Sequence, residues 1–258
     1  MWLLPERKPT GERIHIAVAS NFTGAMEPLA QRFEAMTGYE VVISSGSTGL
    51  LYAQIRNGAP FDALFAADKD RPARLVADGY ALPGSRFTYA VGRLALWSPR
   101  VGVVESDGNL CDSKRLRHMA IANPQLAPYG KAARAVLQAR GLWKTLEKKR
   151  VMGQNIAQTY QFVESGHADV GFVAYSQLRR AGHTADGADG SYWLVPESMH
   201  SPIAQQAVVL NDGAGVSAWM DFIMSDEAQE MIRSFGYGTQ LDTGSAPNIE
   251  SGADIKKR

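Results

Sequence analysis

The chain contains almost no cysteine, since Cys111 is the only one in 258 residues. A single thiol allows no intramolecular disulfide and no zinc site built from cysteines. The five histidines offer no alternative, because none of them stands in an HxxxH or HExxH spacing. The sequence therefore predicts no bare metal cation and no cofactor.

Excess charge and long apolar runs are missing as well. The 27 basic and 26 acidic residues leave a net charge of +1, which gives no support to nucleic acid as a partner. No stretch reaches the roughly 18 apolar residues of a membrane span. Residues 1–8 place a short apolar start before the charges, the reverse of a secretory signal peptide. A trimmed precursor, a wrong start site and a protein that stays inside the cell all remain open.

The chain does contain strand-like apolar runs that alternate with helix-like amphipathic runs. This order is typical of a parallel sheet with helices on both faces. In the first part, strands are predicted at 14–19, 40–44 and 63–67, and helices at 25–37, 50–56 and 71–78. A long strand at 87–97 leads to a second unit, with strands at 119–123, 150–153 and 170–174 and helices at 131–140, 157–165 and 177–181. Strands at 192–195 and 204–210 and helices at 216–224 and 226–234 follow.

Two units of similar build predict an α/β protein with two lobes, each a mostly parallel sheet flanked by helices. Helices after residue 210 need a sheet to cover, so they are assigned to the first lobe. The predicted lobes are 14–90 with 203–240, and 91–202; residues 1–13 and 241–258 are predicted to be flexible termini. Ligands of open α/β sheets bind beyond the carboxyl ends of strands, which places a ligand between the lobes.

Four short polar turns each lie between a predicted strand and a predicted helix. They read ASNF at 19–22, GSTG at 46–49, APYG at 127–130 and QNIA at 154–157. Such a turn directs unpaired backbone N–H groups and the positive end of a helix dipole at one place. None of the four contains a charged residue, a histidine or a cysteine. They can bind an anion but offer no acid, base or metal for catalysis, so an enzyme is not favoured.

Each turn taken alone also has an ordinary structural interpretation. Ser20 or Asn21 is a suitable N-cap for the predicted helix that follows, and Thr48 has the same ambiguity. Tyr129 is of a residue type that more often packs than binds. The anion-binding interpretation depends on the four turns occurring together and in order.

Three runs of sequence resemble the molybdate-binding components of ABC importers. They are IAVASNFTGAMEPLAQRFEAMTG from residue 16, VVISSGSTGLLYAQIRNGAPFDALFAAD from residue 41 and IANPQLAPYG from residue 121. The resemblance extends from about residue 14 to residue 237. It implies a type II periplasmic-binding-protein-like fold, in which two α/β lobes joined by a hinge close on molybdate or tungstate. It also implies a periplasmic monomer that delivers the anion to permease subunits in the membrane.

The resemblance also implies six ligand residues: Ser20, Asn21, Ser47, Thr48, Tyr129 and Ile156. Ile156 can contribute only its backbone N–H, and Tyr129 its backbone N–H and its phenol. One branch of the family has a ligand tyrosine at the position that is Ala174 here. Tyr175 is one residue late and receives no ligand role, so Tyr129 is expected to compensate.

Two alternatives to molybdate transport remain open at this point. The first is a receptor for another tetrahedral oxyanion such as sulfate, because charge and shape are shared and the sequence does not report cavity size. Phosphate is less favoured, since no carboxylate in the turns accepts its proton. The second is a cytoplasmic oxyanion-sensing module, suggested by the unusual N-terminus.

Overall fold

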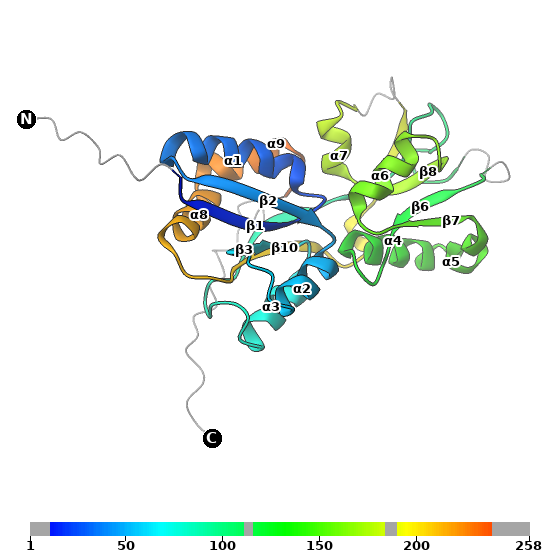
Figure 1. The fold of residues 1–258 in the computed structure, drawn as a ribbon. Helices are drawn as coiled ribbons and strands as arrows, with labels where there is room; N and C mark the ends of the chain where they lie inside the picture. Colours follow the sequence, from blue (N-terminus) through cyan, green and yellow to red (C-terminus); the bar gives the residue numbers. More distant parts are fainter. Residues whose placement is uncertain (1–10, 111–115, 184–189, 239–258) are drawn as a thin grey trace, which may run out of the picture.

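Two five-stranded sheets lie side by side in the computed structural model, which describes residues 11–110, 116–183 and 190–238 (Figure 1). The first sheet has the order β2-β1-β3-β10-β4 and the second has the order β7-β6-β8-β5-β9. Helices cover both faces of each sheet (Figure 1). The predicted α/β fold with two helix-flanked sheets is confirmed. None of the helices in the described ranges is both long and apolar enough to cross a membrane.

The first sheet contains a parallel part and an antiparallel part. Its strands are β1 Arg13–Ala19, β2 Glu40–Gly46, β3 Ala63–Phe65, β4 Phe87–Gly92 and β10 Ile203–Val209. β1 pairs in parallel with β2 and β3, as the β-α-β order predicts. β10 returns from the second unit and runs antiparallel between β3 and β4. The strands of the first ninety residues are therefore parallel to one another, as expected, and the sheet is mixed because β10 enters it.

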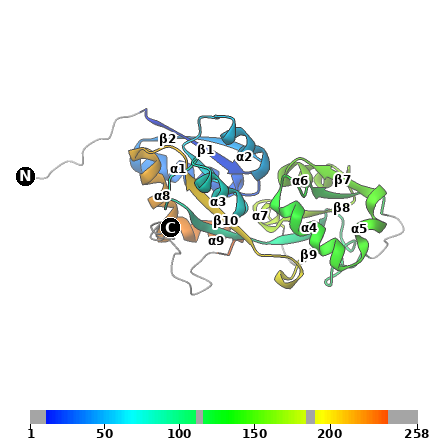
Figure 2. The same ribbon diagram turned by 90° about the horizontal axis from the view of Figure 1, so that it is seen from below.

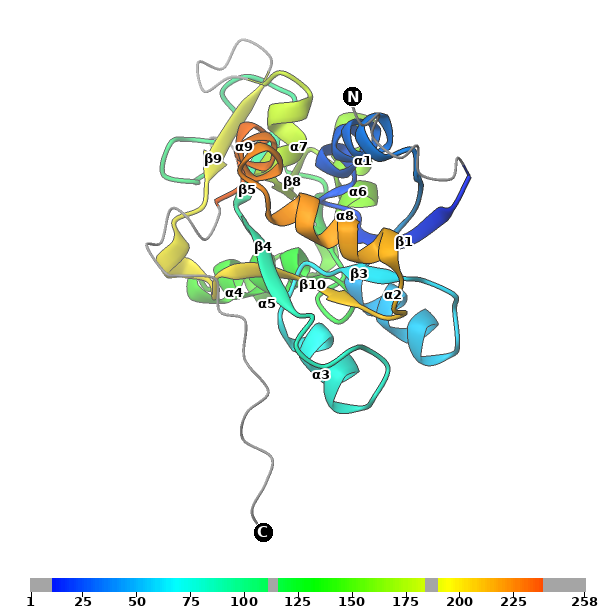
Figure 3. The same ribbon diagram turned by 90° about the vertical axis from the view of Figure 1, so that its left-hand side faces the viewer.

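Both faces of the first sheet are covered by helices. α1 Thr23–Thr37, α8 Ala214–Met224 and α9 Asp226–Ser234 pack on one face, and α2 Thr48–Arg56 and α3 Asp70–Ala77 on the other (Figures 1 and 3). Side chains alternate along a strand. Ile16 and Val18 of β1 therefore pack in the core beneath α1, α8 and α9, while Ala17 packs in the core beneath α2 and α3. Gly38 ends α1 in the left-handed conformation, one residue after the predicted end of this helix.

The second sheet is also mixed. Its strands are β5 Leu94–Ser98, β6 Met119–Ala122, β7 Arg150–Gly153, β8 Val170–Ala174 and β9 Ser191–Leu194. β6 is parallel to β7 and β8, whereas β5 is antiparallel to β8 and β9. Its helices are α4 Pro128–Ala139 and α5 Leu142–Thr145, and, on the opposite face, α6 Ile156–Glu164 and α7 Tyr175–Arg180. The short 3-10 helices η1 Glu147–Lys149 and η2 Glu197–Met199 complete the unit.

The chain crosses between the two sheets after β4 and again before β10 (Figure 2). The single long strand predicted at 87–97 is two strands in different sheets, separated at Arg93. β4 and β10 pair beside this crossing (Figure 3). Residues 1–10 and 239–258, which hold most of the predicted flexible termini, lie outside the described residues. The exact lobe boundaries stay a prediction.

Candidate anion-binding site

The four polar turns meet around one small cavity. All six predicted ligand residues line it, and the other lining residues are Ala19, Gly46, Ala67, Ala127 and Pro128. The cavity volume is about 10 Å³, close to the smallest space that holds a bound water and far below the 300–1,000 Å³ typical of organic ligands. No described side chain along this wall carries a charge. The space is therefore too small for an organic ligand of ordinary size.

The strand directions explain why the turns converge. β1 and β2 end in the cavity wall and are followed by α1 and α2. β6 and β7 lead through short turns to α4 and α6, whose first residues line the cavity. Their N-termini carry partial positive charge and unpaired N–H groups. None of these four helices has an acidic residue in its first turn. The field in the cavity therefore favours an anion, without a cationic side chain in its wall.

The first turn departs from the predicted capping role. Phe22, not Ser20 or Asn21, is the N-cap of α1, and it makes no side-chain capping bond. Ser20 continues the strand instead, because its backbone N–H donates to the Gly46 carbonyl at 2.9 Å. Its hydroxyl is left to line the cavity. The capping interpretation of Ser20 and Asn21 is therefore wrong.

Asn21 is held from behind by residues far away in the sequence. Its side-chain Nδ2 donates to Gln205 Oε1 at 2.8 Å and to Tyr237 Oη at 3.2 Å. Its backbone carbonyl accepts from Tyr237 Oη at 2.7 Å and from Ser176 Oγ at 3.3 Å. The backbone N–H of Asn21 has no protein partner among the described residues. That N–H is the group which Asn21 can offer to an anion.

In the second turn, two hydroxyl oxygens accept bonds from the protein and keep their hydrogens free. Ser47 is the N-cap of α2 and accepts from Leu50 N at 3.4 Å, while Thr48 Oγ1 accepts from Ala67 N at 3.0 Å. Both side chains are buried. Both hydroxyls can therefore donate into the cavity.

The third and fourth turns contribute helix starts. Tyr129 is the second residue of α4, after Pro128, and Ile156 is the first residue of α6. Backbone N–H groups at these positions have no partner within their helix. The N-cap of α6, Asn155, accepts from Gln158 N at 2.9 Å, which leaves the Ile156 N–H unused. The Ile156 N–H is therefore free to donate a hydrogen bond to an anion, which is the role that the resemblance implies for it.

The phenol of Tyr129 is predicted to donate into the cavity. It points instead towards the crossing between the sheets. Its Oη is buried and has no hydrogen-bond partner among the described residues. A Cβ built on Gly92 would lie 2.2 Å from this oxygen, so only glycine leaves room for it. Burial raises the pKa of Tyr129 well above its ordinary value, and the phenol stays neutral. Tyr175 stacks against the Arg93 guanidinium at 5.3 Å and is not in the cavity wall.

The two sheet units touch beside the cavity. The Gly49 N–H donates to the Leu126 carbonyl at 2.8 Å, and Arg71 Nη2 donates to the Gln125 carbonyl at 2.9 Å. A Cβ on Gly49 would lie 3.0 Å from the Leu126 backbone, so glycine permits this close approach. The glycine of the GSTG turn therefore serves the contact between the units.

A larger cavity of about 440 Å³ adjoins the small one and shares Ser20 and Asn21 with it. It lies between α1 of the first unit and α6 and α7 of the second. Arg180 of α7 lines it and forms an ion pair with Glu27 of α1 at 3.0 Å. The sequence did not predict this cavity or the ion pair, whose partners are 153 residues apart.

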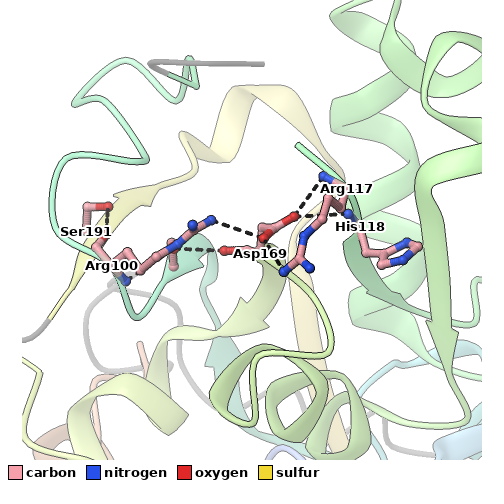
Figure 4. A network of polar contacts seen from close by, with 6 residues as sticks. Arg100, Arg117, His118, Asp169 and Ser191 are labelled. Atoms are coloured by element: carbon pink, nitrogen blue, oxygen red, sulfur yellow. Dashed lines mark hydrogen bonds and ion pairs between the residues drawn. The ribbon is translucent and has the colours of Figure 1, made fainter. Parts of the chain in front are cut away.

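The buried carboxylate Asp169 directly precedes β8, at the end of the second sheet opposite the cavity. Its polar contacts are drawn in Figure 4. It accepts from the backbone N–H groups of Arg117 at 2.8 Å and His118 at 3.2 Å, and from Arg100 Nη2 at 3.1 Å. Burial alone would raise the pKa of Asp169, but these bonds and the Arg117 guanidinium outweigh burial, so the pKa is lowered. The cluster ties β5, β6 and β8 together away from the cavity. No group of three metal-ligating side chains occurs in the described ranges.

Several supporting residues were missed at the sequence level. Gln205, Tyr237 and Ser176 lie 155 to 216 residues away from Asn21, with which they form hydrogen bonds. The one local signal is a polar Gln205 within the apolar run of β10. Spacing alone could not connect it to the first turn.

Comparison with known proteins gives a consistent result. The model of a family described as bacterial extracellular solute-binding protein matches residues 14–238. Molybdate-binding proteins of Azotobacter vinelandii and Rhodobacter capsulatus are each 44% identical, over 88% and 87% of this chain and 90% and 87% of their own lengths.

A solved structure agrees with these relatives. The periplasmic molybdate-binding protein of Azotobacter vinelandii superposes with a TM-score of 0.81 at 41% identity, covering 87% of this chain and 98% of that one. The resemblance predicted from the polar turns is confirmed. The relatives are solute-binding proteins and not enzymes, and this chain belongs to the bacterial extracellular solute-binding protein family.

Proposed function

We propose that this protein binds molybdate, and also tungstate, in the small cavity and delivers it to the permease of an ABC importer. The observation that carries the proposal is the convergence of four helix N-termini, with neutral donors only, on a space too small for an organic ligand. The two relatives that are 44% identical and named for molybdate binding support the choice of anion. The six lining residues from the four turns are the proposed ligands.

Neutral donors can supply enough binding energy for a dianion. A hydrogen bond to a charged acceptor contributes ~1.5–3 kcal/mol net, so about seven such bonds give ~10–20 kcal/mol. Ordering, desolvation and lost freedom oppose this. A net binding free energy of about −8 to −11 kcal/mol corresponds to a Kd between ~1 μM and ~10 nM.

A wall of donors also selects among anions. A protonated oxygen has no acceptor here and would leave one donor unmatched, which disfavours hydrogen phosphate. Sulfate has the same charge and shape as molybdate. Discrimination between these two therefore rests on how the size of the anion fits the closed cavity.

The proposed mechanism is closure of the two sheet units around the anion. Ser20, Asn21, Ser47 and Thr48 belong to the first unit, and Tyr129 and Ile156 to the second. Bending at the two crossings, between β4 and β5 and between β9 and β10, would separate the two donor sets and open the cavity. Contacts such as Gly49 to Leu126 then form on closure and enclose the ligand. We place this monomeric receptor in the periplasm, where it would meet its permease.

The test is isothermal titration calorimetry of purified, dialysed protein with molybdate, tungstate, sulfate and phosphate. One-site binding of molybdate and tungstate below 1 μM, with no heat from sulfate or phosphate, is the expected result. Tighter binding of sulfate than of molybdate would make sulfate the ligand and leave the proposed set of binding residues unchanged. Absence of heat with all four anions, in a folded and anion-free sample, would overturn the proposal.

A further inference from the structure

We propose that Gln205 is a positioning residue of the anion site, which holds Asn21 from behind and pairs with the Tyr129 phenol when the anion is bound. The inference rests on the proposed function and adds a residue that does not itself line the cavity. Gln205 lies in β10, the strand that enters the first sheet from the second unit. It is therefore placed where the two units join.

One end of the Gln205 amide is fully used. Its Oε1 accepts from Asn21 Nδ2 at 2.8 Å and from Tyr89 Oη at 3.1 Å. Gln205 has 0% exposure, so neither bond is replaced by water when it is lost. The Asn21 side chain thus has its orientation fixed by β10, and with it the backbone N–H that faces the cavity.

The other end of the amide is buried without a partner. Gln205 Nε2 and Tyr129 Oη are both buried and unpaired within the described residues. They lie beside the same point, because a Cβ built on Gly92 would be 2.8 Å from the nitrogen and 2.2 Å from the oxygen. An unpaired buried donor is unfavourable. A small shift of the phenol would let Gln205 Nε2 donate to Tyr129 Oη and satisfy both atoms.

Tyr129 connects this pair to the anion. Its backbone N–H stands at the start of α4 and belongs to the cavity wall, while its phenol reaches the crossing strands. Asn21 of the first unit therefore bonds Gln205, and the Tyr129 phenol of the second unit lies beside the same glycine, Gly92, as the Gln205 amide. The geometry links the two halves of the cage through one buried amide, so loss of that amide weakens binding without removal of any ligand group.

The first experiment compares Gln205→Met with Gln206→Met. Gln206 is the matched control on the same strand, because its amide contacts Arg86 and Thr88 and none of the site residues. We expect Gln205→Met to raise the molybdate Kd by about 10-fold or more and to raise the dissociation rate. Gln206→Met should leave both within about twofold of the wild type. Stopped-flow fluorescence and calorimetry give the two quantities.

A double-mutant cycle separates positioning from a loss of stability. Tyr129→Phe removes only the phenol oxygen and keeps the backbone N–H, so it should weaken binding in a well-folded protein. If Gln205 acts through the phenol, Gln205→Met combined with Tyr129→Phe binds more tightly than the product of the two single effects predicts. A merely structural role would lower the unfolding temperature of both unliganded variants and leave their Kd values unchanged.

The outcomes are distinct. Wild-type protein that binds molybdate, with Gln205→Met and Tyr129→Phe binding equally well, would overturn this inference and leave the proposed function intact. Independent effects of the two substitutions would overturn the link through the phenol. Wild-type protein that binds none of the four anions would remove the proposed function and this inference together.

Discussion

Replacement of Ser20 by alanine tests the anion site at a position where a single hydrogen-bond donor, the Ser20 hydroxyl, can be removed. The backbone N–H of Ser20 is committed to the Gly46 carbonyl at 2.9 Å, so only the hydroxyl can reach an anion. The side chain is 8% exposed and makes no capping bond to α1. Ser20→Ala therefore removes one donor and leaves strand pairing and helix start unchanged.

The expected cost follows from the charge of the acceptor. A hydrogen bond from a neutral donor to an anion contributes ~1.5–3 kcal/mol, so the molybdate Kd should rise by about 10- to 150-fold. The change in unfolding free energy without ligand should stay below ~1 kcal/mol. Calorimetry with molybdate, and thermal unfolding without it, measure the two effects.

Ser45→Ala is the matched control for Ser20→Ala. Ser45 is exposed in β2, its hydroxyl bonds Thr23 Oγ1 at 2.8 Å, and it lines the larger cavity but not the small one. Its Kd should change less than about twofold. An unchanged Kd in Ser20→Ala, or an equal loss in both variants, would place the anion elsewhere and refute the reasoning.

Three further predictions concern charge. Burial raises the pKa of Tyr129, so its phenol stays neutral. The molybdate Kd should therefore be flat from about pH 6 to 9, and a titration step within that range would contradict a site made of neutral groups. Asp169 has a lowered pKa in the folded protein, so its stabilising effect is present above about pH 4 and is lost as the pH falls through the folded pKa. Asp169→Asn should lower the unfolding free energy by ~1–3 kcal/mol at pH 7, and urea titrations at acid pH should show a smaller difference from the wild type. The exposed ion pair Glu27–Arg180 joins the two units, so Glu27→Gln should raise the molybdate dissociation rate only about 1.5- to 5-fold. The charge-swapped double variant with Glu27→Arg and Arg180→Glu should return the dissociation rate most of the way to that of the wild type, and an absence of recovery would mean that the pair does not help closure.

Much of the site could be predicted from the sequence because each turn carries its own chemistry. The run from Ser20 to Phe22 and the GSTG turn stand after apolar strands and before amphipathic helices, and the structure places them at one cavity. Most strands and helices begin and end within one to three residues of their predicted positions, since glycines and caps mark their ends. The resemblance added Ile156, which has no polar side chain to reveal it.

What could not be predicted depends on contacts between distant parts of the chain. A polar residue before a helix is usually a cap, yet the amide of Asn21 bonds Gln205 and Tyr237 instead. The 87–97 run is mostly apolar and is interrupted by Gly92 and Arg93, but only the sheet order shows that the chain changes sheets at this interruption. The antiparallel entry of β10 likewise depends on where the chain returns after the second unit.

The caps in this protein are arranged so that some helix donors remain unused. Ser47 and Asn155 each accept from the N–H of the third helical residue, which leaves the first N–H of α2 and of α6 without a partner. α1 and α4 have no side-chain cap at all.

If all the N-terminal N–H groups of these four helices were capped by side chains, the protein would be more stable but could not bind the anion, because no N–H group would be left for it. The free donors cost stability in the absence of ligand, and an anion that bonds to them returns it through linkage. The same N–H groups cannot both cap and bind, so under the proposed function the unpaired donors at these four turns are the groups that the anion satisfies.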